Sequence, residues 1–191
     1  GGRMGQADIR GYRIDTGPTV LTMPDIIEEA FAAVGASMSE RLELMPVDPA
    51  YRASFADGSS LDVHTGAEAM TAAIEQFAGP DQAAGYLRLR DWLTELYRLE
   101  MDGFISSNFD SPLSLLTPQL ARLAAIGGFR GWERMVGKFI SDERLQRIFT
   151  FQALYAGVPP QDALAAYAVI AYMDTVAGVY FPRGGMRAVP E

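Results

Sequence analysis

Apolar residues recur at helical spacing through most of the chain beyond residue 65. The clearest case lies between Arg88 and Asp102, where apolar positions three and four residues apart alternate with charged ones. Such spacing places the apolar side chains on one face of a helix and the charged side chains on the other. The pattern therefore predicts a long amphipathic helix. Its apolar face consists of Leu89, Trp92, Leu93, Leu96 and Leu99.

Capping signals predict where other helices begin. Pro24 suits the first position of a helix, because its missing N–H needs no partner there. The pairs Ser111–Pro112 and Thr117–Pro118 each read as a cap followed by the first helical residue. Two further helices are expected over residues 141–155, capped by Ser141, and near residues 162–175.

Strand patterns concentrate in the first third of the chain. Residues 51–55 and 61–64 alternate between apolar and polar on either side of Asp57–Gly58, which is typical of a β-hairpin. Together with the helices, these patterns predict an α+β fold, in which a small β layer with a hairpin precedes a helix-rich block. Further strands are expected over residues 9–14, 42–47 and 178–181.

Composition narrows the chemistry. The 191 residues include no cysteine, which excludes disulfides, thiolate metal sites and a cysteine nucleophile. His64 is the single histidine and, from its place in the predicted hairpin, is given no role. The net charge of −8 argues against a nucleic-acid partner, and no apolar run reaches the roughly 20 residues that cross a bilayer. No metal site is predicted.

Glycine-rich turns near both ends are the candidate binding elements. Gly1-Gly2-Arg3 opens the chain, Gly17-Pro18 follows the first predicted strand, and Arg183-Gly184-Gly185 follows the last. Glycines beside arginine let the backbone approach an anion closely and leave N–H groups free to bind it. The competing interpretation is a solvent-exposed loop or cloning scar for the first turn, an ordinary strand-ending turn for the second, and a glycine turn before a helix for the third.

These turns, in this order and with the residues between them, resemble the bacterial phytoene desaturase family of FAD-dependent carotenoid desaturases, related to the flavin amine oxidases. The resemblance covers essentially the whole chain and rests on the ordered set of motifs. Besides the glycine turns, the matching segments are Tyr86–Trp92, Pro112–Leu123, Phe139–Leu145, Phe151–Gly157 and Gly178–Met186.

The resemblance implies FAD as the cofactor and a larger FAD-binding α/β oxidoreductase as the parent. The family's Gly-x-Gly-x-x-Gly loop and its C-terminal part have no counterpart here, so the chain is expected to be a fragment that is inactive alone. On this basis residues 1–64 belong to the FAD-binding β region, residues 65–176 form the helical substrate region, and residues 177–191 re-enter the FAD-binding region.

The resemblance also implies site residues. Those expected to contact FAD are Gly1, Gly2, Arg3, Gly17, Pro18, Arg183, Gly184 and Gly185. Phe151, Tyr155 and Phe181 are expected to line a site for a carotenoid or other isoprenoid, although an aromatic stripe at helical spacing is more often simply core. Catalytic residues are not assigned.

The implied function is the FAD-dependent desaturation of a carotenoid precursor such as phytoene. Two alternatives stay open. One is a sister reaction on the same scaffold, such as that of a carotenoid isomerase or ketolase or another amine-oxidase-like oxidoreductase. The other is a non-catalytic helical lipid-binding module. The sequence leaves the oligomeric state open.

A basic segment over residues 112–140 departs from the acidic background. Arg122, Arg130, Arg134 and Lys138 are interleaved there with leucine, phenylalanine and tryptophan. This composition is typical of a segment that lies on a membrane surface without spanning it. We therefore expect a cytoplasmic protein, peripheral to the inner face of the cell membrane. The competing interpretation is a pair of helices packed on a neighbouring domain.

Overall fold

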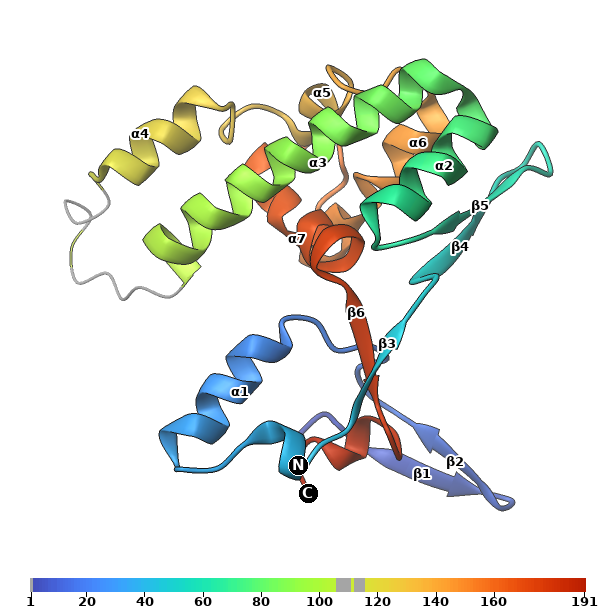
Figure 1. The fold of residues 1–191 in the computed structure, drawn as a ribbon, viewed down its shortest axis with the longest axis vertical. Coiled ribbons are helices and arrows are strands. Elements are labelled where there is room, and N and C mark those ends of the chain that lie inside the picture. The colour runs from blue at the N-terminus through green and yellow to red at the C-terminus, as the bar shows by residue number, and fades with distance from the viewer. Residues whose placement is uncertain (1, 106–110, 112–115) are drawn as a thin grey trace.

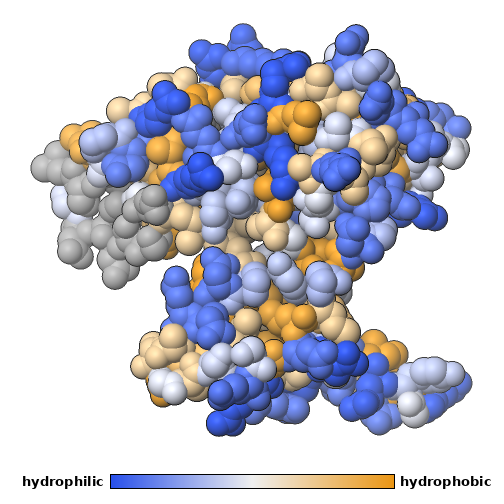
Figure 2. Space-filling model, in the orientation of Figure 1, coloured by the Kyte–Doolittle hydropathy of each residue, from blue (hydrophilic) through white to orange (hydrophobic). Residues whose placement is uncertain are grey.

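The computed structural model describes residues 2–105, 111 and 116–191. Its chain forms two lobes joined by a narrow waist (Figures 1 and 2). We call residues 48–177 the helical lobe, and residues 2–47 with 178–191 the terminal lobe. Both chain ends lie in the terminal lobe (Figure 1).

The elements run in the following order. The helices are α1 (Pro24–Ala33), α2 (Ala67–Ala78), α3 (Pro80–Glu100), α4 (Pro118–Ala125), α5 (Trp132–Val136), α6 (Glu143–Ile148) and α7 (Val169–Tyr172). The strands are β1 (Gln6–Ile9), β2 (Tyr12–Asp15), β3 (Leu44–Val47), β4 (Tyr51–Ser54), β5 (Ser60–Val63) and β6 (Val179–Pro182). Short 3₁₀ helices cover Met38–Glu40, Phe151–Ala156, Ala165–Ala168 and Met186–Ala188, and π-helical turns cover Met101–Ile105 and Met173–Ala177.

The strands pair two by two and antiparallel, as β1–β2, β3–β6 and β4–β5. The β3–β6 pair sets Leu44 opposite Pro182 and so joins distant parts of the chain across the waist (Figure 1). Helices and small sheets together confirm the predicted α+β class. The predicted hairpin around Asp57–Gly58 is present as β4–β5.

The prediction of a single strand over residues 9–14 is wrong, because the chain folds there into the β1–β2 hairpin. Arg10 and Gly11 form its turn with φ values of 54° and 84°. Gly11 adopts a positive φ without steric cost, so the chain can reverse within two residues. Ile9 then pairs with Tyr12 across the turn.

Three of the predicted signals for helix starts can be compared with the structure. Helix α1 begins at Pro24 as predicted. Thr117 caps α4 as predicted, since its side chain accepts a hydrogen bond from Leu120 N at 3.1 Å. Ser141 does not cap α6, because its own amide and hydroxyl are bonded to Gln82. The neighbouring Asp142 caps α6 instead, with Oδ1 accepting from the N–H of Arg144 at 2.9 Å. Pro112 of the Ser111–Pro112 signal lies outside the described residues.

The two helices expected over residues 141–155 and 162–175 are broken. The first ends at Ile148 and continues, after a short break, as a 3₁₀ helix. The second starts late, because residues 160–163 form a turn and a bend and Leu164 forms a β-bridge with Gly131, beside which Ala165 N donates to Arg130 O at 2.7 Å. It then ends in the π-helical turn Met173–Ala177.

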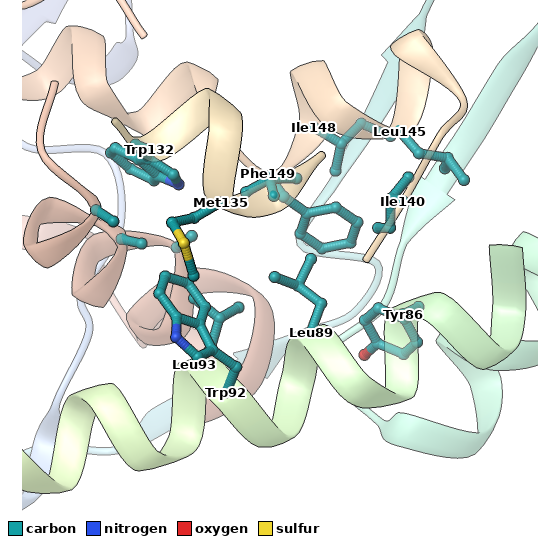
Figure 3. Packing of buried hydrophobic residues seen from close by; sticks show 14 of the residues in the cluster. Tyr86, Leu89, Trp92, Leu93, Trp132, Met135, Ile140, Leu145, Ile148 and Phe149 are labelled. Carbon is teal, nitrogen blue, oxygen red and sulfur yellow. The ribbon is translucent and has the colours of Figure 1, made fainter. Parts of the chain in front are cut away.

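The main hydrophobic core lies in the helical lobe. Figure 3 shows side chains of α3 facing those of α5, α6 and the segment between them. Tyr86 stacks on Phe149 with ring centroids 5.7 Å apart. Gly85 lets α3 approach the backbone of Phe139 closely, because a Cβ there would lie 2.1 Å from Phe139 O. Leu61 and Val63 of β5 complete the core, so the β4–β5 hairpin packs on this lobe.

Candidate functional site

The structure brings the glycine turns of the two chain ends together around Asp15. Asp15 ends β2, and its Oδ2 accepts a hydrogen bond from Met186 N at 3.0 Å. A Cβ on Gly185 would lie 3.0 Å from the same oxygen. The turn after β6 therefore packs directly against the end of β2. This juxtaposition joins residues 171 positions apart in the sequence.

The turn that opens the chain, at Gly2 and Arg3, packs against the turn that follows β2. A Cβ on Gly17 would lie 1.9 Å from Arg3 O, so only glycine allows the two backbones to approach in this way. Thr16 N donates to Gly5 O at 2.9 Å next to this contact. We call Gly2, Arg3, Gly17, Pro18, Gly184 and Gly185 the glycine cluster. Gly1, also expected to contact FAD, lies outside the described residues.

The glycine cluster offers open backbone that could accept a cofactor. Gly2 and Gly184 have φ values of 57° and 93°, and a Cβ on either would meet nothing within 4 Å. Exposed backbone at positions that favour glycine lets a bulky anion approach the N–H groups. These positions thus offer the kind of open backbone that the phosphate groups of a dinucleotide require.

The two arginines of the predicted cofactor turns differ in their surroundings. Arg183 forms a two-point ion pair with Glu43, at 2.5 and 2.8 Å. The hydrogen bonds from Arg183 lower the pKa of Glu43. Within the described part of the chain, Arg3 forms no ion pair, and it is exposed. Arg3 is therefore the cation of the cluster that is available to an anion.

The chain leads from the glycine cluster into the waist. After Gly17–Pro18, Leu21 forms a β-bridge with Tyr180, with N···O distances of 2.9 and 2.8 Å. Tyr180 belongs to β6, which runs on to Arg183. Residues 19–22 are thereby fixed beside β6, and three of them line the cavity described next.

A cavity of about 610 Å³ lies at the waist between the lobes. This volume falls within the roughly 300–1,000 Å³ of small-molecule sites. Its wall is largely aliphatic and aromatic, and we call it the aromatic cavity. The lining residues are Thr19, Val20, Thr22, Ala50, Tyr51, Phe151, Tyr155, Ile170, Met173, Asp174 and Val179.

Two of the three predicted substrate residues line this cavity. Phe151 packs edge-to-face against Tyr51 at 5.5 Å and against Tyr155 at 5.7 Å between ring centroids. Tyr51 thereby joins a continuous row of rings that the sequence did not single out. Phe181 is half-buried in β6 and is not among the lining residues, so its role stays a prediction.

Asp174 is the residue that sequence reasoning missed. It is 8% exposed and lines the aromatic cavity. Both carboxylate oxygens lie 3.3 Å from Gln152 Nε2. Burial raises the pKa of Asp174 to about 7. In the sequence, the feature that could have pointed to Asp174 is its place as a single acid directly after the apolar stretch from Ala163 to Met173.

A second buried acid, Glu100, lines a separate apolar pocket of about 440 Å³, and burial raises its pKa to about 8. Among the described residues, no group of three or more acidic or histidine side chains could hold a metal ion. His64 Nδ1 lies 3.0 Å from Asp48 Oδ2 at the surface of the helical lobe.

Comparison with known proteins identifies the class. The family model described as flavin containing amine oxidoreductase matches residues 1–191. The chain therefore belongs to this family, and FAD is the cofactor that membership implies.

Individual relatives extend the comparison. The chain is 68% identical to a phytoene dehydrogenase of Streptomyces griseus over 100% of its own length and 38% of that protein. It is 33% identical to a zeta-carotene-forming phytoene desaturase of Myxococcus xanthus, covering 37% of that protein. It is also 33% identical to a lycopene-forming phytoene desaturase of Pantoea ananas, covering 38%. The predicted resemblance to phytoene desaturases is thus confirmed, and the chain spans less than two fifths of the length of these relatives.

Proposed function

We propose that the protein desaturates a carotenoid precursor such as phytoene with FAD as the cofactor. The observation that carries this proposal is the path of residues 17–22, which run from the glycine cluster into the wall of the aromatic cavity. A flavin held at one end and a hydrocarbon held at the other would then share one site. The names of the relatives support the same reaction.

The residues present suit a hydrocarbon substrate. Desaturation removes a hydride and a proton from adjacent carbons, and a bound flavin supplies the acceptor for the hydride. Tyr51, Phe151 and Tyr155 offer ring surfaces to an apolar chain and to positive charge that develops on it. Gly2, Arg3, Gly17 and Gly184 would hold the cofactor through open backbone and one unpaired cation.

Expression of the complete gene in a host that accumulates phytoene tests this proposal. Extracted pigment should shift to longer-wavelength absorption as conjugated double bonds are added. Conversion between isomers, or addition of oxygen, without new double bonds would instead favour a sister reaction. Unchanged phytoene with a properly folded, flavin-loaded protein would contradict the proposal.

We further propose that the protein docks on the inner face of the cytoplasmic membrane through residues 116–140. Arg130, Arg134 and Lys138 are exposed there, and Phe129 is 51% exposed beside them. A basic surface with an exposed aromatic residue favours anionic lipid. A substrate that dissolves in bilayers gives the reason for such docking. The part of the chain that the structure describes has no helix suited to crossing a membrane.

The structure narrows which residues can take part in docking. Trp132 and Leu123 are buried in the core of the helical lobe, so they cannot enter a membrane. Arg122 is engaged by Glu95 at 2.6 Å. Leu113 and Leu115, also part of the predicted segment, lie outside the described residues.

Liposome flotation tests the docking. The double variant Arg130→Glu with Arg134→Glu should lose binding to vesicles that contain anionic lipid. A matched control, Arg10→Glu with Arg13→Glu, changes two exposed arginines of the β1–β2 hairpin and should bind as the wild type does. Binding that ignores anionic lipid, or equal loss in both variants, would contradict this surface.

A further inference from the structure

Asp174 occupies an unusual position for a carboxyl group. It lies in the π-helical turn that follows α7. Such turns are rare in proteins and are frequently found at functional sites. Its partner Gln152 is fully buried, donates to Ile148 O at 3.0 Å, and has no partner for its own Oε1. The cavity wall thus contains a buried carboxyl whose side-chain partner is a single, shared amide.

No cation compensates this carboxyl among the described residues. The titratable groups that face it are Tyr51 of β4 and Tyr155 of the 3₁₀ helix, both neutral phenols near pH 7. The Gln152 amide and the backbone N–H groups of Asp174 and Thr175 favour the carboxylate, but they do not offset the cost of burying it. The carboxyl can therefore change its protonation state near neutral pH, as its pKa of about 7 indicates.

A hydrocarbon substrate gives this carboxyl nothing to recognise. A polyene has no hydrogen-bond donor or acceptor, so a charged group in its site serves no purpose in binding alone. The reaction, however, releases a proton from the carbon next to the one that loses hydride. A carboxylate exposed to the cavity can accept that proton and stabilise the positive charge that precedes its release.

We propose that Asp174 is the base that takes up the proton released in desaturation, an inference that rests on the proposed function. A bound flavin would supply the acceptor for the hydride, which leaves one carbon with its electron pair. The adjacent C–H bond then breaks, its electron pair forms the new C=C bond, and its proton goes to Asp174 Oδ. Asp174 ends the step protonated and must release the proton before the next.

The Asp174→Asn variant of the complete gene product tests the assignment. A general base contributes roughly 10²–10⁴-fold, so kcat should fall by about 100-fold or more. The wild-type rate should rise with pH through an inflection near the Asp174 pKa of about 7, and the variant should lack this inflection. Asp174→Glu should restore part of the rate. Asp162→Asn, at an exposed acid before α7, should change neither property.

A readout independent of turnover is the infrared band of a protonated, buried carboxyl. This band should be present at pH 5 and lost by pH 9, and in Asp174→Asn it should shrink to the share of Glu100, whose pKa burial raises to about 8. An unchanged rate and pH profile in a flavin-loaded Asp174→Asn would overturn the assignment while leaving the proposed function intact. If Asp174→Asn fails to fold, a wild-type rate that shows no inflection near the Asp174 pKa of about 7 overturns it in the same way. A loaded wild-type protein that leaves phytoene unchanged would instead refute the proposed function.

Discussion

In the helical lobe α3 buries a row of large side chains, among them Tyr86, Leu89 and Leu93, whereas α1 of the terminal lobe buries none of its residues. Of the described residues in the terminal lobe, the buried apolar side chains are Leu21, Leu42, Val179, Pro182 and Met186. Tyr12 of its hairpin is 74% exposed. The helical lobe is thus held by packing, and the terminal lobe by hydrogen bonds, glycine contacts and strand pairing.

Because of this difference in packing, the two lobes suit different functions. Dense packing gives the helical lobe a rigid wall for an apolar cavity, since closely packed cores resist deformation. Open backbone and unburied side chains leave the terminal lobe free to contact other groups, a cofactor included. The aromatic cavity lies where the two kinds of structure meet.

The largest expected effect is loss of the helical core. Trp132 is fully buried, so Trp132→Ala should lower the free energy of unfolding by about 4–5 kcal/mol. Tyr12→Ala in the terminal lobe should cost less than about 0.5 kcal/mol, because Tyr12 is largely exposed. Urea unfolding measures both. Similar losses in the two variants would remove the contrast between the lobes.

A smaller effect should come from pH. The pKa of Asp174 is raised from 3.8 to about 7, so between these values the folded state binds more protons than the unfolded state. Stability should therefore fall as pH rises from about 4 to about 7, by about 3–4 kcal/mol at 1.36 kcal/mol per unit.

Glu100, whose pKa burial raises to about 8, acts in the same direction. The Asp174→Asn variant separates the two groups, because it should lose the part of the pH dependence of stability that comes from Asp174 and keep the part that comes from Glu100. Thermal unfolding at pH 4 and pH 8 measures the difference. A variant with the full wild-type pH dependence would contradict the buried, uncompensated state of Asp174.

The terminal lobe should respond to loss of its central hydrogen bond. Asp15→Ala removes the acceptor of Met186 N and should cost about 1.5–2 kcal/mol. Hydrogen exchange should report the loss at Met186 and leave the amides of α3 protected. Uniform loss of protection in both lobes would mean that they unfold together.

The smallest predicted effect tests a helix cap. Asp142→Ala should cost about 1 kcal/mol, because Oδ1 of Asp142 accepts from Arg144 N and Leu145 N. Ser141→Ala should cost less, since Ser141 is exposed and does not cap α6. The reverse order in urea unfolding would reinstate Ser141 as the cap.

The sequence predicted the elements whose signals are local. The spacing of α3, the Thr117 cap and the Asp57–Gly58 turn each depend on residues close in the chain, and each is confirmed. The prediction of Ser141 as the cap of α6 was wrong, because Ser141 is hydrogen-bonded to Gln82, which lies 59 residues away in the sequence. Local signals could not reveal that contact.

The residues of the candidate site likewise fall into those that the sequence pattern revealed and those that depend on distant partners. Glycine turns and aromatic residues carried a readable pattern, and the structure brings them together. The part played by Asp15 depends on Met186, and the burial of Asp174 depends on Gln152 and Tyr51. These partners come from separate elements, so no spacing rule connects them.

The most direct test of the account is flavin retention by the purified product of the complete gene. Gly17→Val would force a side chain into Arg3 O, 1.9 Å from the Cβ position, and should abolish most of the flavin absorbance per protein. Gly66→Ala, with open space around its Cβ, should retain it. Both variants should keep the wild-type circular dichroism. A folded Gly17→Val protein with full flavin content would contradict the claim that the glycine cluster binds the cofactor.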